Sequence, residues 1–267
     1  MKIKTTLLLS ALTLGAVAAQ AQTAAPAAPT AKAPEPDFTL AYNIGAVSDY
    51  RYRGISQTRL KPAIQGGADF AHKSGFYLGG WASNIKWIKD NSSTGYPVEG
   101  PVELDIYGGY KFAAGPVAMD VGALRYQYVG NGLKSTRVNG VGGVYGDANT
   151  NEIYAAASYS VATFKYSRSL GNLFGNLNSK GSQYFDLNAN FDLGSGFTLT
   201  PHAGRQIVNG SPSLSYTDYS VTLAKDLGNG FSLSAMAVST NAKPAGYTWG
   251  GKEVGKSGAV LGVKYTF

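Results

Sequence analysis

The stretch Tyr184-Phe185-Asp186-Leu187-Asn188-Ala189-Asn190-Phe191-Asp192-Leu193 alternates apolar and polar side chains without a break. The apolar parity holds Phe185, Leu187, Ala189, Phe191 and Leu193, and the polar parity holds Asp186, Asn188, Asn190 and Asp192. Because successive side chains of a β-strand point to opposite faces, this pattern predicts a strand with one apolar and one wet face.

Two further segments repeat the pattern. Segment 102–107, Val-Glu-Leu-Asp-Ile-Tyr, sets apolar residues on one parity and carboxylates on the other. Segment 259–267 carries apolar residues at every odd position up to Phe267, with Gly262, Lys264 and Thr266 between them. The printed chain therefore ends within a predicted strand.

Polar connections divide the rest of the chain, and they alternate in length. The longer ones are 48–62, 87–101, 130–151, 168–182, 208–215 and 241–257. The shorter ones are 72–75, 113–116, a weaker one near Val161, 192–196 and 226–230. Six long and five short connections imply about twelve strands with both ends on the short-turn side, as in bacterial outer-membrane barrels. The predicted fold is all-β, a transmembrane antiparallel up-and-down β-barrel.

A soluble sandwich or a lipocalin is the alternative, since its strands also alternate. The 35 glycines, the 18 tyrosines, the absence of cysteine, the regular long and short loops and the final Phe267 favour the membrane barrel. In such a barrel, aromatic residues near strand ends form interfacial girdles, while the alternative places them in a core as ordinary β-formers. The girdle candidates are Tyr77, Trp87, Phe112, Tyr126, Tyr128, Tyr154 and Tyr184.

The first residues predict export. Lys2 and Lys4 precede an apolar run over 5–19 and a small-x-small site at Ala19-Gln20-Ala21, the pattern of a signal peptide spanning 1–21. An uncleaved anchor or a buried helix is the alternative. Residues 22–37 are rich in Ala and Pro and predict a periplasmic lead-in, which leaves 38–267 as the barrel domain in a Gram-negative outer membrane.

The charge balance limits the partners. The formal net charge is +7, and two of the lysines lie in the signal peptide, so the mature chain is only mildly basic and shows no nucleic-acid footprint. The partners expected of such a barrel are outer-membrane lipid, lipopolysaccharide, small hydrophilic solutes and the assembly machinery that receives a terminal strand ending in Phe267.

The first predicted loop carries a recognisable block, Ser48-Asp49-Tyr50-Arg51-Tyr52-Arg53-Gly54-Ile55-Ser56-Gln57. This block resembles the S-D-Y-x-x-R-G-x-S-Q pattern of the TorF family of porins, and the resemblance extends less sharply to 80–84 and to 103–109. It implies an outer-membrane barrel of porin character. It implies neither a solute nor assigned binding or catalytic residues.

The same loop concentrates charge at Asp49, Arg51, Arg53 and Arg59. Guanidinium groups are planar, permanently charged donors suited to carboxylates and phosphates. They are expected to line a constriction or hold the loop folded inward, which biases a pore toward anions. The alternative is that they pair with Asp49 and other loop carboxylates or bind lipopolysaccharide.

The polar parities predict the lining of the interior, because a charged side chain facing lipid at mid-depth is costly. The candidates are Glu103, Asp105, Lys111, Asp120, Asp186, Asn188, Asn190, Asp192 and Lys264. Arg125 and Arg205 fall on apolar parities, which indicates either a β-bulge or a strand-end position.

An enzyme is the less favoured reading. His72 falls in a predicted short turn and His202 in a predicted strand without a recognisable partner, and the chain has no G-x-S-x-G elbow and no H-E-x-x-H pair. No nucleotide, haem or metal motif is visible, so no cofactor is expected. Twelve strands lie between filled and open barrels. We therefore expect a narrow passive pore, with a non-conducting structural or surface-interaction barrel as the alternative.

Overall fold

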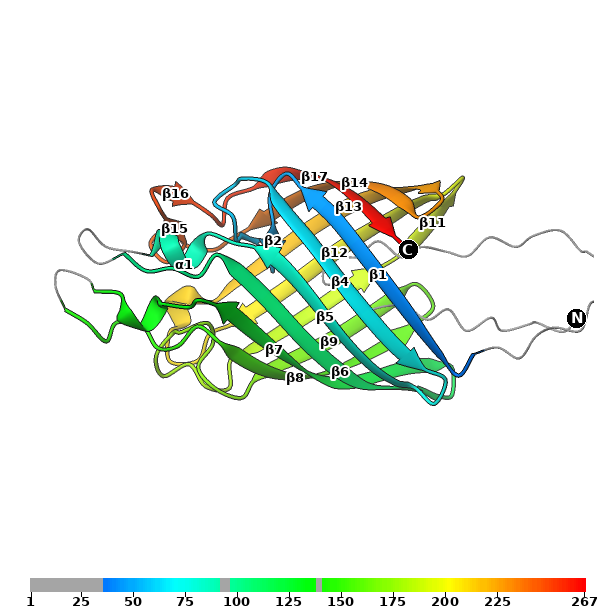
Figure 1. The fold of residues 1–267 in the computed structure, drawn as a ribbon, viewed down its shortest axis with the longest axis horizontal. Helices are drawn as coiled ribbons and strands as arrows, with labels where there is room; N and C mark the ends of the chain where they lie inside the picture. Colours follow the sequence, from blue (N-terminus) through cyan, green and yellow to red (C-terminus); the bar gives the residue numbers. More distant parts are fainter. Residues whose placement is uncertain (1–35, 92–96, 138–140) are drawn as a thin grey trace, which may run out of the picture.

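The computed structural model describes residues 36–91, 97–137 and 141–267, so the predicted signal peptide and most of the lead-in lie outside the described residues. A tilted antiparallel sheet closes on itself as a barrel (Figure 1). Its strands are β1 (Phe38–Val47), β4 (Ala63–His72), β5 (Phe76–Asn84), β6 (Val102–Ala114), β7 (Val117–Val129), β8 (Thr150–Tyr159), β9 (Ala162–Ser169), β10 (Gln183–Ala189), β11 (Phe191–Gly194), β12 (Phe197–Ile207), β13 (Tyr216–Gly228), β14 (Phe231–Thr240) and β17 (Gly258–Thr266).

Closure gives the barrel twelve strand positions. The sheet order runs from β10 through β1 and β17 to β11, and β10 also pairs with β12. Since β10 and β11 are consecutive pieces that both pair with β12, they occupy one position. The first and last strands meet in antiparallel register, with Ile44 opposite Tyr265. The predicted fold class is confirmed.

The connections confirm the predicted alternation. Two- or three-residue turns join the strands at one end of the barrel, called here the short-turn end, where β1 begins and β17 ends. Several are tight: Ser195 and Gly196 have φ of 52° and 76°, and Asn229 and Gly230 have 51° and 82°. Positive φ at both central residues is what the type I′ turn of a two-residue hairpin requires.

The other end, the long-loop end, carries six longer connections. All but the connection between β9 and β10 hold short elements of their own, which gather on one side of Figure 1. These are β2 (Arg51–Tyr52), β3 (Ile55–Ser56), α1 (Trp87–Asp90), η1 (Leu133–Ser135), η2 (Pro212–Leu214), β15 (Thr248–Trp249) and β16 (Lys252–Glu253). None of the helices in the described residues is long and apolar enough to cross a membrane.

Apolar side chains cover the outside of the barrel. Along β1, Leu40, Tyr42 and Ile44 are exposed while the alternate residues are partly covered. On β6, Glu103 and Asp105 are buried on the inner parity and Ile106 is exposed on the outer one. Large apolar groups that stay exposed on every other residue match the lipid-facing band of a membrane barrel.

The two outward arginines lie at strand ends, without a bulge. The β6–β7 and β12–β13 registers run unbroken past Arg125 and Arg205. Arg125 donates to Gln127 and Asn151, and Arg205 donates to Thr217, all near the long-loop end. The strand-end alternative is therefore the correct one.

The predicted aromatic girdle is mostly wrong. Of its seven candidates only Phe112 is exposed on the outer wall, and Tyr77, Trp87, Tyr126, Tyr128, Tyr154 and Tyr184 are buried or turn inward. A girdle of other residues exists at the short-turn end, where outer-wall rings pack in neighbouring pairs. These pairs include Phe38–Phe70, Phe76–Tyr110, Phe231–Tyr265 and Tyr265–Phe267.

Candidate functional site in the barrel interior

The first long loop forms a small hairpin, called here the inner hairpin (residues 51–56). Arg51 and Tyr52 of β2 pair with Ser56 and Ile55 of β3. The two residues between them, Arg53 and Gly54, have φ of 48° and 78°. Glycine accepts this conformation without strain, so the Arg53-Gly54 pair makes a two-residue turn and places an arginine at its tip.

Asp49 holds the base of the inner hairpin. Its carboxylate accepts from Arg51 Nε at 2.5 Å, from Ser56 Oγ at 2.5 Å and from Thr58 Oγ1 at 3.3 Å. Arg51 Nη1 also donates to the backbone carbonyls of Val254 and Lys256 in the last loop. Because both ions are almost fully buried, the pair ties the hairpin to the loop beside it.

The tip of the inner hairpin lies against the inner wall of the barrel. A Cβ on Gly54 would come within 2.5 Å of Thr240 Cγ2 and 2.8 Å of Asp218 Cβ, which belong to β14 and β13. Only a glycine fits so close to the wall. The loop is thus folded inward, as one reading of its charged residues predicted.

Arg53 spans the interior from the hairpin tip. Its Nη2 donates to Glu152 Oε2 of β8 at 2.7 Å, and its Nη1 donates to Gln206 Oε1 of β12 at 2.7 Å. The guanidinium carbon lies 4.8 Å from the ring centroid of Tyr52 and 4.2 Å from that of Tyr184. The Arg53 and Glu152 side chains are 7% and 3% exposed. Hydrogen bonds, charge and ring faces therefore hold one planar cation.

Arg59 pairs as well, with Asp90 of α1 at 3.0 Å. All three guanidinium groups of the first loop therefore contact carboxylates, as the alternative reading of the sequence expected. Burial raises the pKa of Asp90, although the charge of Arg59 lowers it.

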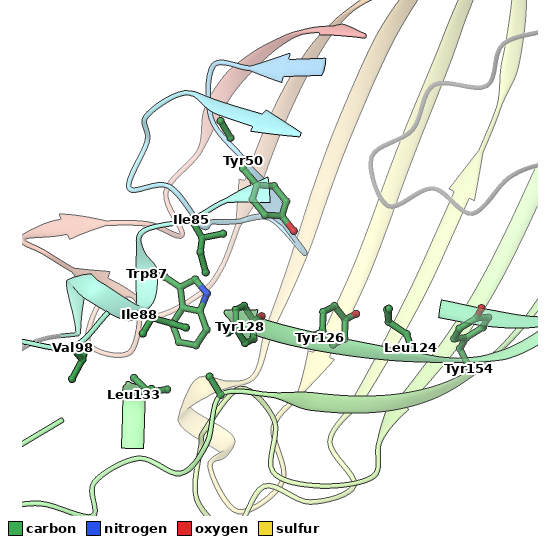
Figure 2. Packing of buried hydrophobic residues seen from close by; sticks show 12 residues of the cluster. Tyr50, Ile85, Trp87, Ile88, Val98, Leu124, Tyr126, Tyr128, Leu133 and Tyr154 are labelled. Atoms are coloured by element: carbon green, nitrogen blue, oxygen red, sulfur yellow. The ribbon is translucent and has the colours of Figure 1, made fainter. Parts of the chain in front are cut away.

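Aromatic residues pack beneath the loops at the long-loop end (Figure 2). Trp87 of α1 meets the ring of Tyr128 edge-on, and Tyr50 meets Trp81 of β5 in the same way. The Tyr50 hydroxyl donates to Glu103 Oε1 at 2.7 Å. Burial, and then the charge of Glu103, raises the pKa of Tyr50, so this hydroxyl keeps its proton and its role as donor.

Two predicted interior carboxylates lie under this cluster. Glu103 and Asp105 are 1% and 0% exposed on the inner face of β6. Glu103 has the Tyr50 donor, whereas neither oxygen of Asp105 has a hydrogen-bond partner in the described part of the chain. A buried carboxylate without a donor loses its hydration without replacement, which destabilises the packed arrangement above it.

The interior nearer the short-turn end is wetter. Tyr77 donates to Asp120 at 2.6 Å, and Lys111 lies 4.8 Å from the Tyr77 ring. Lys264 and Asp69 also sit on inner parities, and all these side chains are half-buried. This part of the wall carries both signs of charge.

The remaining predicted residues follow β10 and β11. Asp186 and Asn188 face His202 on β12, and Asn190 accepts from Thr200 Oγ1. Asp192 is exposed and accepts from the Gly194 amide in the turn. Asp192 thus belongs to the short-turn end and not to the inner wall.

His202 has partners that sequence reasoning did not find. Its Nε2 lies 2.9 Å from Asp218 Oδ1, its Nδ1 lies 3.4 Å from Asp186 Oδ1, and the Tyr184 hydroxyl donates to Asp218. Sequence reasoning also missed Asp69, Glu152, Lys165 and Gln206, although the parity of their strands marks each as inward. Within the described residues no group of three or more His, Asp or Glu side chains is arranged to hold a metal ion.

The comparisons with known proteins fit this architecture. The family model described as "Bacterial protein of unknown function (Gcw_chp)" matches residues 31–267. The comparison with curated proteins finds no match. Among solved structures, the KdgM porin in complex with disordered oligogalacturonate has a TM-score of 0.50 at 8% identity, over 85% of this chain and 98% of that one. The NanC porin has a TM-score of 0.50 at 10% identity, over 85% and 99%. At such identities the likeness shows the fold, a porin-like barrel.

Proposed function

This chain belongs to the Gcw_chp family, and we propose that it is an outer-membrane channel for passive diffusion of small hydrophilic solutes, narrowed by the inner hairpin. The resemblance of its first loop to TorF porins supports the same assignment. The short-turn end faces the periplasm and the long-loop end faces outward, after export on the signal peptide over 1–21. Lipopolysaccharide and the assembly machinery are its partners in the membrane.

The half-buried, mixed-charge wall near the short-turn end carries the proposal. Lys111, Asp120 and Lys264 lie there on inner parities, while apolar residues cover the outside. Charged groups on a wet wall replace part of the hydration shell of a passing solute. If the interior served only as a packed core, charged side chains of both signs would not be expected on the inner wall near the short-turn end.

The inner hairpin sets the size limit. Its tip touches β13 and β14, while Arg53 reaches β12, which is paired with β13, and β8, which lies three strand positions further round the barrel. We expect this crossing to restrict passage to small solutes and to dominate the resistance of the channel. Because each guanidinium of the loop is paired, the proposal assigns no anion preference to Arg51, Arg53 or Arg59.

Single-channel recording tests the function. The chain from Gln22 is refolded and compared in planar bilayers with a variant in which two glycines replace residues 51–56. Small, reproducible current steps are expected for the wild type, and several-fold larger steps for the variant. Gly251→Ala, at the tip of the β15–β16 hairpin, is the control and is expected to leave the current unchanged, because a Cβ at this position meets nothing within 4 Å. Folded barrels that carry no current in either form would contradict the proposal.

A non-conducting structural barrel is the second candidate. The buried Arg53–Glu152 pair and the packed aromatic cluster favour it, because both stabilise a filled long-loop end. In this case the wild type carries no current, and removal of residues 51–56 lowers stability without opening a path.

A further inference from the structure

The guanidinium group of Arg53 occupies a place that is built mostly by the barrel wall. Glu152 of β8 supplies a carboxylate, Gln206 of β12 an amide oxygen, and Tyr184 of β10 a ring face at 4.2 Å. Of the side-chain contacts that Arg53 makes with the described residues, only the one with the ring of Tyr52 lies within the hairpin.

These wall groups are held in position by partners other than Arg53. Gln206 Nε2 donates to the carbonyls of Gln183 and Ile207, at 3.0 Å and 3.2 Å, which turns Oε1 toward the interior. The Tyr184 hydroxyl donates to Asp218 at 3.1 Å. Glu152 accepts from Tyr126 at 3.3 Å. A site whose groups are already oriented binds its ligand without first ordering them.

The charge around this place favours a cation. Besides Glu152, three carboxylates lie on the inner face of the same end: Glu103, Asp105 and Asp218. The other cations facing them are Lys165, which stacks on Tyr154 at 4.0 Å, and His202, which lies against Asp218. Without Arg53, the Tyr126 hydroxyl at 3.3 Å is the remaining hydrogen-bond donor to the Glu152 side chain among the described residues, so this buried carboxylate is left without a hydrogen-bonded cation.

The geometry selects one chemical class among cations. Two different nitrogens of the group donate to two acceptors on separate strands, while its central carbon lies over the Tyr184 ring. A guanidinium has this planar fork, whereas an ammonium is a compact point charge. Stacking on tyrosine adds a cation–π contribution.

We propose that Glu152, Gln206 and Tyr184 form a binding site for guanidinium-bearing solutes, and that Arg53 occupies it as a tethered competitor. An incoming solute of this class displaces the tip of the inner hairpin and takes its place. The consequence for transport rests on the proposed channel function, whereas the binding itself does not.

Equilibrium binding tests the site directly. Methylguanidinium chloride is titrated into the detergent-solubilised Arg53→Ala barrel and followed by calorimetry, with methylammonium as the matched cation. We expect binding of methylguanidinium at least about tenfold tighter than that of methylammonium. Adding Glu152→Gln is expected to weaken it by about tenfold or more, and the wild type is expected to bind weakly because Arg53 fills the site.

Arg205→Ala is the control, because it removes a guanidinium from the outer face beside Gln206 and leaves Arg53 in place. It is expected to behave as the wild type. Equal affinity for the two cations in Arg53→Ala, or wild-type binding as tight as that of the variant, would overturn the proposal. If Arg53→Ala does not fold, Arg53→Lys provides the test: its ammonium still gives Glu152 a cation but lacks the planar fork, so methylguanidinium is expected to bind this variant more tightly than the wild type.

Bilayer recording separates this inference from the proposed function. If Arg53→Ala binds methylguanidinium but carries no current, the binding site is supported and the proposed channel function is contradicted. If it carries current but binds methylguanidinium no better than methylammonium, the channel function is supported and the binding site is contradicted.

Discussion

The two ends of the barrel interior have the same strand pattern and different environments. At the long-loop end, Glu103 and Asp105 are at most 1% exposed beneath loops and aromatic rings. At the short-turn end, Lys111, Asp120 and Lys264 are half-buried. The difference arises from the inner hairpin and its neighbouring loops. Alternation decides that a side chain points inward, and a loop folded over it decides whether it meets water.

Two ion pairs of nearly equal length give the largest expected contrast between these ends. Arg53–Glu152 is 2.7 Å long and buried, while Lys73–Asp37 is 2.6 Å long with both side chains more than half exposed. Glu152→Ala should lower the free energy of unfolding by about 3–5 kcal/mol, because it leaves a buried cation. Lys73→Ala should change it by about 0–1 kcal/mol. Urea unfolding in micelles measures both, and equal losses would contradict the comparison.

Two glycines at hairpin tips test whether insertion of the hairpin matters. Gly54→Ala and Gly251→Ala both place a side chain at positive φ, with a shared cost of about 1–2 kcal/mol. Only Gly54 also meets the wall, so its variant should lose about 1–3 kcal/mol more and conduct more current. Similar urea midpoints and similar currents for the two variants would mean that the hairpin does not seat in the interior.

Two tyrosine hydroxyls sharpen the comparison further. Tyr50 donates to buried Glu103 at 2.7 Å, and Tyr107 donates to half-buried Asp69 at 2.5 Å. Tyr50→Phe should cost about 1.5–3 kcal/mol because water does not reach Glu103, while Tyr107→Phe should cost less than about 1 kcal/mol. Urea unfolding in micelles measures both variants. A larger loss of unfolding free energy for Tyr107→Phe than for Tyr50→Phe would contradict the conclusion that the long-loop end is the dry one.

The smallest effect concerns the pH response of the loops. Burial raises the pKa of Asp90, so the folded protein binds this proton more tightly than the unfolded chain does. The resulting stability is present below about pH 4 and is lost as pH rises through the raised pKa. Asp90→Asn should remove this loss, while its amide still offers Arg59 an acceptor. Unfolding midpoints of wild type and variant, measured from about pH 3 to about pH 6, should therefore converge at the acidic end; parallel profiles would contradict the assignment.

The aromatic residues show where sequence reasoning reached its limit. Tyr126 and Tyr184 lie near strand ends, where a girdle is expected, but they share the parity of inward residues and pack inside. Strand parity was visible in the sequence and was the better guide. The general enrichment of aromatics at membrane interfaces says nothing about the face on which a given ring lies.

The partners of the charged residues lay beyond the reach of the sequence. Arg53 and Glu152 are 99 positions apart, and His202 meets carboxylates on β10 and β13. Such pairs exist only after the sheet has closed and a loop has folded into it. Many carboxylates of the chain are possible partners for one arginine, and the spacing of residues along the sequence does not show which of them it meets.

The sequence by itself determined the count of about twelve strands, the alternating loop lengths and the face of most of the charged wall residues. These features follow from a two-residue side-chain period and from local turn chemistry, which act over short distances along the chain. Only the tertiary structure decided that the first loop enters the barrel, that Arg53 meets Glu152, and that one end of the interior is dry. These outcomes depend on contacts between distant segments, because closure of the barrel is what brings β8, β12 and the inner hairpin to one place.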